Sequence, residues 1–394
     1  MRARLLVLTA ALLAFMAMPF AALADLEAGV AAFEVQDYDE ALRQFSDPAL
    51  ARDSEALSYL AWMAYKGLGQ PRDLVAAYAY LSLTVMYDPA GPQSELAGGR
   101  RVVASELTAE QILQGEQRVI AHLRQAMGEE GLNTAVAEAV QALQACSRQD
   151  CVTAAEKVVA LGPAAVLAIP QLEVLMTADP LWIPRQTYAY ALSSIGTKAV
   201  PALCRIGENM EERRREGTWN AMQSAASLAG LGPAAREGRD CLLRIMAGLD
   251  KNLPAEEKQV GIDVAGDEYA MLYETERVVA YALVVVGDPE RASEAAMQAA
   301  YLAEPGGEKG RLMAYVIGMI YGNLGPILEV APAGLADENP EIRIETLSIL
   351  TDLAETPDFA RGAQPIVPAL QAIAEGDDPD EAELAAHILG LIAP

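Results

Sequence analysis

Apolar side chains recur every three or four residues along most of the chain, which is the spacing of amphipathic helices. Residues 28–45 predict two short helices around a turn at Asp37. Residues 56–65 predict a longer helix closed by Gly67, and Asp73 opens the next helix. Alanine and leucine are abundant while aromatic residues reach only 6%, a composition that favours helices over strands. The pattern therefore predicts an all-α protein without a sheet.

From about residue 133 to the C-terminus the pattern repeats as helical hairpins, each with a glycine at its turn. These glycines are Gly162, Gly196, Gly232, Gly287, Gly325 and Gly362. Their successive spacings are 34, 36, 55, 38 and 37 residues, so one long interval predicts an insertion near residues 250–267. Such a period is typical of an α-solenoid, because no single hairpin can bury its apolar face alone.

Proline and acidic residues mark where the helices of these hairpins begin. Pro170, Pro201 and Pro368 open short second helices, where a missing N–H has no cost. The pairs Asp179-Pro180 and Asn339-Pro340 precede the next first helices, each followed by an arginine, and Asp378-Pro379 precedes one without it. The sequence thus predicts regular units of one longer and one shorter helix.

Two repeat families resemble these segments. Residues 25–127 resemble the Sel-one-like repeat, a relative of the tetratricopeptide repeat, in the Leu-Ala-x-Met-x-Tyr-x-Gly-x-Gly core at 60–69 and in the Ala-Tyr-x-Tyr-Leu helix at 77–81. Residues 133–394 resemble the HEAT repeat of the phycobilisome-lyase type in their glycine turns, Val-Pro-Ala-Leu strings and Asp-Pro-Arg signals. Both resemblances imply an α-solenoid, with a joint between the two parts at residues 128–132.

Charge narrows the classes of partner. The 394 residues include 55 acidic and 29 basic side chains, which gives a net charge of −26. A surface this acidic repels phosphate backbones and anionic lipids, so it excludes nucleic-acid or membrane-surface binding as a main activity. The hydrophobic content of 52% excludes a disordered chain. The expected partner is a protein or peptide, with no membrane contact in the mature form.

Residues 1–24 have the order of a secretory signal. Arg2 and Arg4 precede an apolar run at 5–20, and Ala22-Leu23-Ala24 has the small-residue pattern read by signal peptidase. An uncleaved anchor is the alternative, because the apolar run is near the length that spans a bilayer. Cleavage would make Asp25 the first residue of a periplasmic or secreted protein.

Few residues offer catalytic or metal-binding chemistry. The two histidines, His122 and His387, lie in opposite terminal regions, and no His/Cys pair has ligand spacing. The basic run at 213–215 is flanked by glutamates, which favours a neutralised loop over a phosphate site. Aromatic side chains could line a binding face or fill the core; these are Trp182, Tyr188 and Tyr190. We therefore expect no catalytic residue, cofactor or metal.

The four cysteines of an exported chain predict two disulfides, with three possible connectivities. Cys146 and Cys151 bracket a polar turn, which favours a local bridge. Cys204 follows Gly196 by eight residues and Cys241 follows Gly232 by nine, so both fall in second helices of consecutive units. We expect Cys146–Cys151 and Cys204–Cys241, with reduced buried thiols as the alternative for the second pair.

Three functions follow from the resemblances. The first is a non-enzymatic extracytoplasmic scaffold or adaptor that binds proteins, as most members of both families do. The second is a lyase or chaperone-like protein for a small molecule, as the phycobilin lyases are, although export fits poorly with cytoplasmic chromophore attachment. The third is β-lactam binding, known among cysteine-rich Sel-one-like proteins, although residues 25–127 contain no cysteine. We expect the first.

Overall fold

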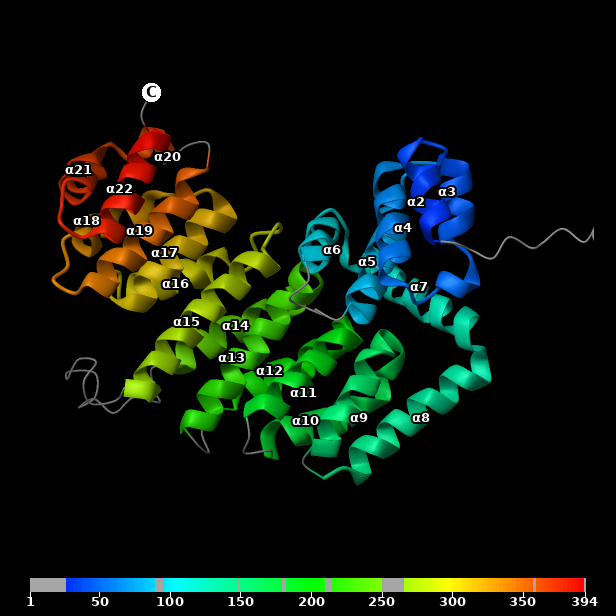
Figure 1. Cartoon of the computed structure of the whole chain (residues 1–394). Coiled ribbons are helices and arrows are strands. Elements are labelled where there is room, and N and C mark those ends of the chain that lie inside the picture. The colour runs from blue at the N-terminus through cyan, green and yellow to red at the C-terminus, as the bar shows by residue number, and fades with distance from the viewer. Residues whose placement is uncertain are drawn as a thin grey trace, which may run out of the picture.

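In the computed structural model every regular element is a helix, and the described part of the chain contains no strand. The described residues are 26–88, 95–147, 149–178, 182–209, 214–249, 266–356 and 359–392. The all-α, solenoid-like arrangement expected from the sequence is thereby confirmed (Figure 1). The proposed signal segment 1–24 and residues 250–265 of the expected insertion lie outside the described residues.

Within the ranges given above, the N-terminal region consists of helices joined by short turns. They are α2 (Leu26–Glu34), α3 (Tyr38–Phe45), η1 (Pro48–Leu50), α4 (Ser54–Lys66), α5 (Leu74–Tyr87), α6 (Glu95–Ser105) and α7 (Ala109–Met127). Their starts follow from local chemistry, since Asp37 and Asp73 each accept a hydrogen bond from the N–H three residues on. At α7, Thr108 and Gln111 form both hydrogen bonds of a capping box. Gly67, in the left-handed conformation, ends α4.

The remaining helices follow one another as stacked pairs. They are α8 (Glu129–Ala145), α9 (Gln149–Val159), η3 (Gly162–Ala168), α10 (Ile169–Ala178), α11 (Trp182–Ile195), η4 (Thr197–Ala199), α12 (Val200–Glu208), α13 (Arg214–Leu231), η5 (Gly232–Gly238), α14 (Arg239–Leu249), α15 (Gly266–Val286), α16 (Glu294–Ala303), α17 (Glu308–Tyr321), α18 (Gly325–Leu335), α19 (Pro340–Ala354), α20 (Phe359–Gly362), η7 (Gln364–Ile366), α21 (Val367–Ala374) and α22 (Pro379–Ile392). As expected, Pro170, Pro201 and Pro368 each lie at the second position of a short helix.

The turn glycines agree with expectation in four units and differ in two. Gly162, Gly196, Gly232 and Gly287 all have positive φ, between 47° and 89°. Gly325 is instead the first residue of α18, and the residue that follows the end of α17 at Tyr321 is Gly322, whose φ is 67°. Gly362 is the last residue of α20. A larger side chain would be crowded at this position, because a Cβ there would lie 2.8 Å from Leu328 Cδ1.

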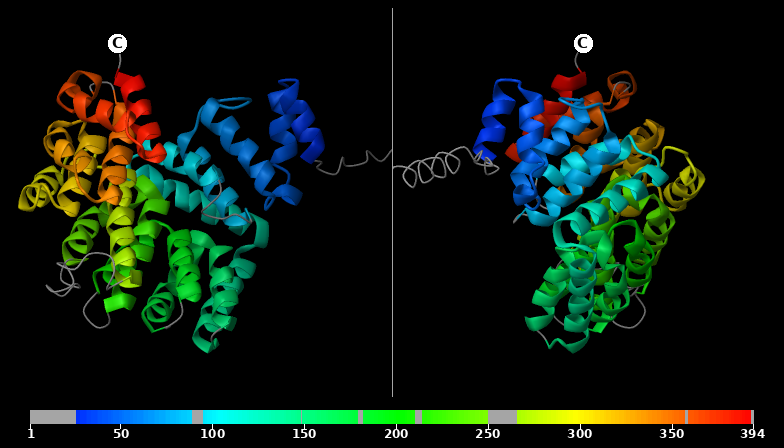
Figure 2. Two further views of the ribbon diagram at one scale, coloured as in Figure 1. Left: turned by 60° about the vertical axis from the view of Figure 1, so that its left-hand side comes forward. Right: turned by 90° about the vertical axis from the view of Figure 1, so that its right-hand side faces the viewer.

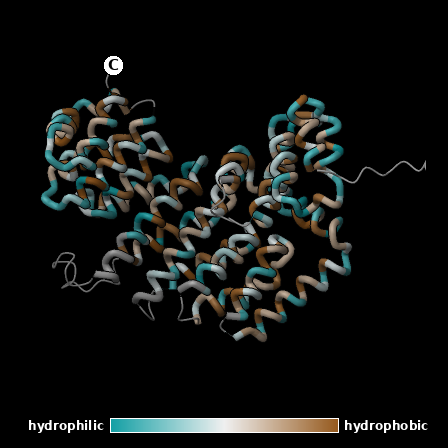
Figure 3. Tube along the Cα trace, viewed as in Figure 1, coloured by the Kyte–Doolittle hydropathy of each residue, from teal (hydrophilic) through white to brown (hydrophobic). Residues whose placement is uncertain are grey.

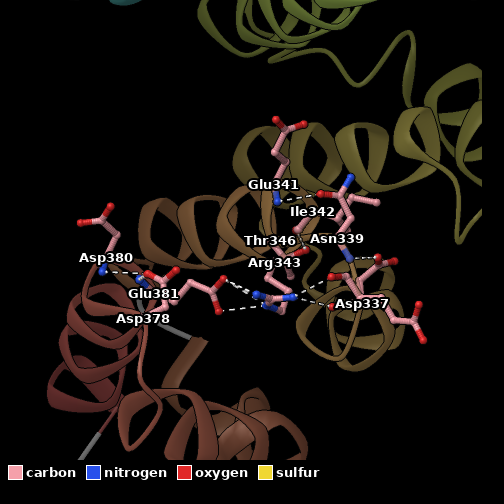
Figure 4. A network of polar contacts seen from close by, with 10 residues as sticks. Asp337, Asn339, Glu341, Ile342, Arg343, Thr346, Asp378, Asp380 and Glu381 are labelled. Atoms are coloured by element: carbon pink, nitrogen blue, oxygen red, sulfur yellow. Dashed lines mark hydrogen bonds and ion pairs between the residues drawn. The ribbon is translucent and has the colours of Figure 1, made fainter. Parts of the chain in front are cut away.

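An arginine on α19 ties this helix to α22 (Figure 4). The Arg343 guanidinium donates to both carboxylate oxygens of Glu381 on α22, at 2.6–3.1 Å, and to the carbonyls of Asp337 and Glu338. Asn339 caps α19 by accepting from the N–H of Glu341 at 3.0 Å. The Asn-Pro-Arg signal in the sequence therefore both starts a helix and ties it to the next unit.

The two regions meet at a single residue and pack along a broad contact. Gly128 alone separates α7 from α8, so the joint is shorter than the expected 128–132. Helix α6 lies against η5, and α7 against η3. Arg100 donates to the carbonyl of Gly230 at 2.8 Å, and Arg236 donates to the carbonyl of Leu107 at 3.1 Å.

The whole chain curves so that its first and last helices lie on the same side of α9–α14 (Figures 1 and 2). Polar and apolar positions alternate along each helix (Figure 3), and buried apolar residues form one continuous core from Ala32 to Ile392. No helix in the described ranges has both the length and the apolar character needed to cross a membrane.

Candidate functional site

An apolar groove opens in the N-terminal region between α2, α4, α5 and α6, with a volume of about 530 Å³. We call it the aromatic groove. Its lining residues are Phe33, Ser58, Tyr59, Ala61, Trp62, Tyr65, Leu81, Leu96, Gly99, Val102 and Val103. They come from four helices, so the groove exists only when the whole region is folded.

The helical period of α4 explains why one of its faces is buried and the other lines the groove. Leu57, Leu60 and Met63 are fully buried. Trp62 is 50% exposed, and Val102, across the groove on α6, is 58% exposed. Two facing helices therefore expose large apolar side chains to solvent. Such exposure does not stabilise a monomer.

Two features hold the groove open and shape its walls. Gly99 on α6 has no side chain, and a Cβ there would lie 3.7 Å from Leu81 Cδ2, inside the groove. Tyr59 is fixed by neighbouring rings, stacked on Phe45 with centroids 4.7 Å apart and edge-on to Phe33 at 5.0 Å. One wall is therefore a rigid aromatic surface, and the α6 wall carries no side chain at Gly99.

One end of the groove is polar. The Tyr65 hydroxyl donates to Glu106 at 3.1 Å, and Arg72 forms an ion pair with the same carboxylate at 2.7 Å. The hydrogen bond from Arg72 lowers the pKa of Glu106 below its ordinary value. Lys66 Nζ lies 4.7 Å from the Trp62 ring centroid and 5.0 Å from that of Tyr65. The positive charge of Lys66 also helps to lower the pKa of Glu106, so Lys66 belongs to the same polar end of the groove.

Neither histidine lines the aromatic groove, and the two lie on different helices, α7 and α22. His122 Nε2 lies 2.7 Å from the carbonyl oxygen of Ala51, which ties α7 to the loop before α4. His387 is exposed on α22, at the other end of the chain. The structure thus places His122 in a structural contact and brings neither histidine to a shared site.

The other residues singled out in the sequence lie outside the groove. Tyr188 is fully buried in the core, and the Tyr190 hydroxyl donates to the Val85 carbonyl at 3.4 Å, between the two regions. The side chains of Trp182 and of the arginines at 213–215 lie outside the described residues. Of the aromatic candidates, the two that the structure describes are therefore packing residues.

Both expected cysteine pairs are disulfides in the structure. Cys146 and Cys151 have Cα atoms 4.9 Å apart, and Cys204 and Cys241 join α12 to α14 with Cα atoms 5.6 Å apart. The Glu208 carboxylate lies within 4.8 Å of the second pair, the one grouping with metal-ligand proximity in the described ranges. Its sulfurs are bonded to each other and are not thiolates, so they are not available as metal ligands.

Sequence reasoning missed the aromatic groove, although one signal for it was present. Trp62 occupies the variable position x of the Leu-Ala-x-Met motif, between buried Ala61 and Met63. A large aromatic residue at that position lies outside the core, so it indicates an exposed apolar surface. The facing residues on α6 could not be assigned to it, because they lie about forty residues away on another helix.

No protein-family model matches this chain, and no curated protein matches it either. Function is therefore inferred from the sites themselves, because a helical fold alone supports many activities.

Proposed function

We propose that the protein is a non-enzymatic extracytoplasmic scaffold that holds a peptide segment of a partner protein in the aromatic groove. The observation that carries this proposal is the groove itself, with Trp62 and Val102 exposed across a volume of about 530 Å³. Apolar pockets with a few polar groups at the edge are typical binding sites. Rigid aromatic side chains supply most of the binding energy at such surfaces.

The groove chemistry defines the peptide. The groove is apolar along most of its length and favours large aliphatic or aromatic side chains, while Lys66 at one end favours a carboxylate. In a chain with a net charge of −26, most of the surface repels acidic peptides, so Lys66 provides local attraction. The expected ligand therefore carries bulky apolar residues followed by an acidic residue or a C-terminal carboxylate.

A matched pair of glycine variants tests this function. Gly99→Leu puts a side chain into the groove, whereas Gly98→Leu makes the same change at a position where a Cβ comes within 4 Å only of the Arg101 guanidinium. Peptides selected from a displayed random library on the wild-type protein should bind Gly99→Leu at least tenfold more weakly and Gly98→Leu within about twofold. Binding is measured by titration calorimetry.

Several outcomes would contradict the proposal. Equal binding of the selected peptides to both variants would show that the groove is not the peptide-binding site. Tetrapyrrole absorbance in protein purified from its native host would indicate the lyase-like alternative. Turnover of a chromogenic β-lactam would indicate the β-lactam-binding alternative. The assignment of residues 25–127 and 133–394 to Sel-one-like and HEAT-like repeats belongs to the same proposal, and the helical hairpins support it.

Export is the second part of the proposal. Two disulfides persist in oxidising compartments, which supports a location outside the cytoplasm. We propose that residues 1–24 are removed and that the mature chain begins at Asp25 in the periplasm or the medium. Intact-mass measurement on protein from its native host should give the mass of residues 25–394, and a retained N-terminal segment would contradict cleavage.

A further inference from the structure

We propose that the partner segment held in the aromatic groove is an amphipathic α-helix with an acidic residue at the end that meets Lys66. The proposal rests on the proposed function of the groove and adds the conformation and polarity of the bound segment. It is supported by the shape of the groove, by the hydrogen bonds of its lining residues and by the charge at its polar end.

The walls of the groove match one face of a short helix in length. Helices α4 and α6 each pack against α5, and within the described ranges they share little contact with each other. The walls are residues 58–65 of α4 and 96–103 of α6, and Leu81 of α5, which is 8% exposed, lies at the bottom. Each wall covers two helical turns, or about 11 Å. A bound helix presents large apolar side chains at positions i, i+4 and i+7 over the same length.

The groove offers few hydrogen bonds to the main chain of a ligand. Every lining residue except Leu96 lies beyond the first turn of its helix, so its main-chain N–H bonds within that helix. The carbonyl of Val102 accepts from the Ser105 hydroxyl at 2.7 Å. The hydroxyl of Ser58 donates to the Glu55 carbonyl at 2.7 Å. An extended peptide would therefore bury main-chain groups without partners, whereas an α-helix pairs its own.

A polyproline helix is the other conformation that aromatic grooves bind, and it fits this groove less well. Its carbonyls make no internal hydrogen bonds and need donors from the groove. The Tyr65 hydroxyl already donates to Glu106 at 3.1 Å, and Lys66 Nζ lies over the Trp62 ring, 4.7 Å from its centroid. The groove thus favours a segment that satisfies its own main chain.

The polar end of the groove determines where an acidic residue of the bound helix lies. Lys66 and Arg72 provide two positive charges there, against one negative charge from Glu106. The chain as a whole has a net charge of −26, so this local excess of positive charge contrasts with its surroundings. A helix with an acidic residue one turn after its last apolar position is therefore attracted in one orientation.

Selection from two displayed peptide libraries on the full-length protein tests the conformation. The libraries have the same composition and place large apolar residues either at positions i, i+4 and i+7 or at every second position. Excess Gly99→Leu protein serves as a competitor, so that only peptides that need the groove are recovered. We expect binders from the library with helical spacing and none from the alternating library.

Substitutions in the tightest helical binder provide a second measurement. Proline at a central position that faces away from the groove should weaken binding at least tenfold by titration calorimetry, because it breaks the helix. Alanine at the same position favours a helix and should leave binding within twofold. Val102→Ser, at an exposed position on the α6 wall, should also weaken the binder, which keeps the test valid if Gly99→Leu lowers stability.

A charge variant tests the orientation. Lys66→Gln should weaken a binder with glutamate in its last turn about fivefold and should leave its glutamine counterpart within twofold. Lys157→Gln, at an exposed lysine of α9, is the control and should affect neither peptide. Equal effects of the two lysine variants would overturn the assigned orientation.

The remaining outcomes separate this proposal from the proposed function. Binders from the alternating library, or a helical binder that tolerates the central proline, would overturn the helical conformation and leave the groove as a peptide site. Recovery of no peptide that distinguishes the wild type from Gly99→Leu would overturn both.

Discussion

Gly196 adopts a backbone conformation that is nearly restricted to glycine, with φ of 89° and ψ of −148°. A Cβ at this position would collide with the Glu116 carboxylate from α7. Glu116 is buried and accepts from both the N–H and the hydroxyl of Thr197, each at 2.7 Å. The glycine therefore makes room for a carboxylate that joins the two regions.

Gly196→Ala should destabilise the protein by about 3 kcal/mol, because it adds the loss of the Glu116 hydrogen bonds to the strain of a positive φ. Gly322→Ala is the control, since Gly322 has φ of 67° but no atom within 4 Å of a Cβ. Its expected cost is about 1–2 kcal/mol from strain alone. Urea unfolding midpoints compare the two, and equal losses would show that Glu116 plays no part.

Gly232 is the corresponding turn residue one unit later, with φ of 61°. A Cβ there would lie 2.9 Å from Cγ of Arg101, a flexible side chain that can move aside. Gly232→Val should therefore cost about 1–2 kcal/mol, close to strain alone. An unchanged urea midpoint would mean that the backbone at this turn relaxes.

Glu308 at the start of α17 should make stability depend on pH. Burial, together with the nearby carboxylates of Glu276 and Glu345, raises the pKa of Glu308 to about 9. Between its ordinary value of 4.5 and 9 the folded chain holds the proton and the unfolded chain does not. The free energy of unfolding should therefore fall as the pH rises through this range.

The variant Glu308→Gln mimics the protonated group and should flatten this pH dependence. Its urea midpoint should exceed that of the wild type at pH 8 and approach it at pH 4. Glu338→Gln, at an exposed position, is the control and should follow the wild type at both values. A wild-type midpoint that rises between pH 5 and 8 in step with the variant would contradict the assignment.

At the scale of helices, the Cys204–Cys241 disulfide ties two second helices that are consecutive in the stack. It closes a sequence separation of 37 residues, against five for Cys146–Cys151. Replacing both cysteines of the long pair by serine should cost about 4 kcal/mol, and of the short pair about 2 kcal/mol, in the chain-entropy account. Urea unfolding compares the two double variants, and an equal loss would argue against loop length as the cause.

The repeat register explains why this pairing was predictable from sequence. Proline openings and glycine turns recur with the hairpin period, so two cysteines in the same helix of neighbouring units must lie side by side. The same register misplaced the turn at Gly325, because the left-handed glycine that follows α17 is Gly322, three residues earlier. That segment contains more than one glycine. The hairpin period is too imprecise to distinguish between two glycines only three residues apart.

At the scale of the whole molecule, the sequence predicted two regions but not how they pack together. The hydrogen bonds from Arg100 to Gly230 and from Arg236 to Leu107 span 130 and 129 residues. Local periodicity carries no information about contacts of that range. The aromatic groove was hidden for the same reason, because its walls come from four helices whose spacing is set by tertiary packing.

These contacts should make the two regions unfold together. We expect a single thermal transition for the wild type by circular dichroism, and an earlier, separate loss of the N-terminal helices when Arg100 and Arg236 are both replaced by methionine. Arg43→Met, at an exposed arginine with 60% side-chain exposure, is the control and should leave one transition. Two transitions in the wild type would contradict this coupling.

The contact between Arg100 and α13 has a consequence for how this protein can diverge. The guanidinium binds the main-chain carbonyl of residue 230, which every amino acid provides. A Cβ at Gly230 would meet no atom within 4 Å, so that position is also free to accept side chains. In descendants of this chain, the arginine should be retained while its acceptor changes freely. Methods that detect contacts from paired substitutions would then overlook this one, even though it helps hold the two regions together.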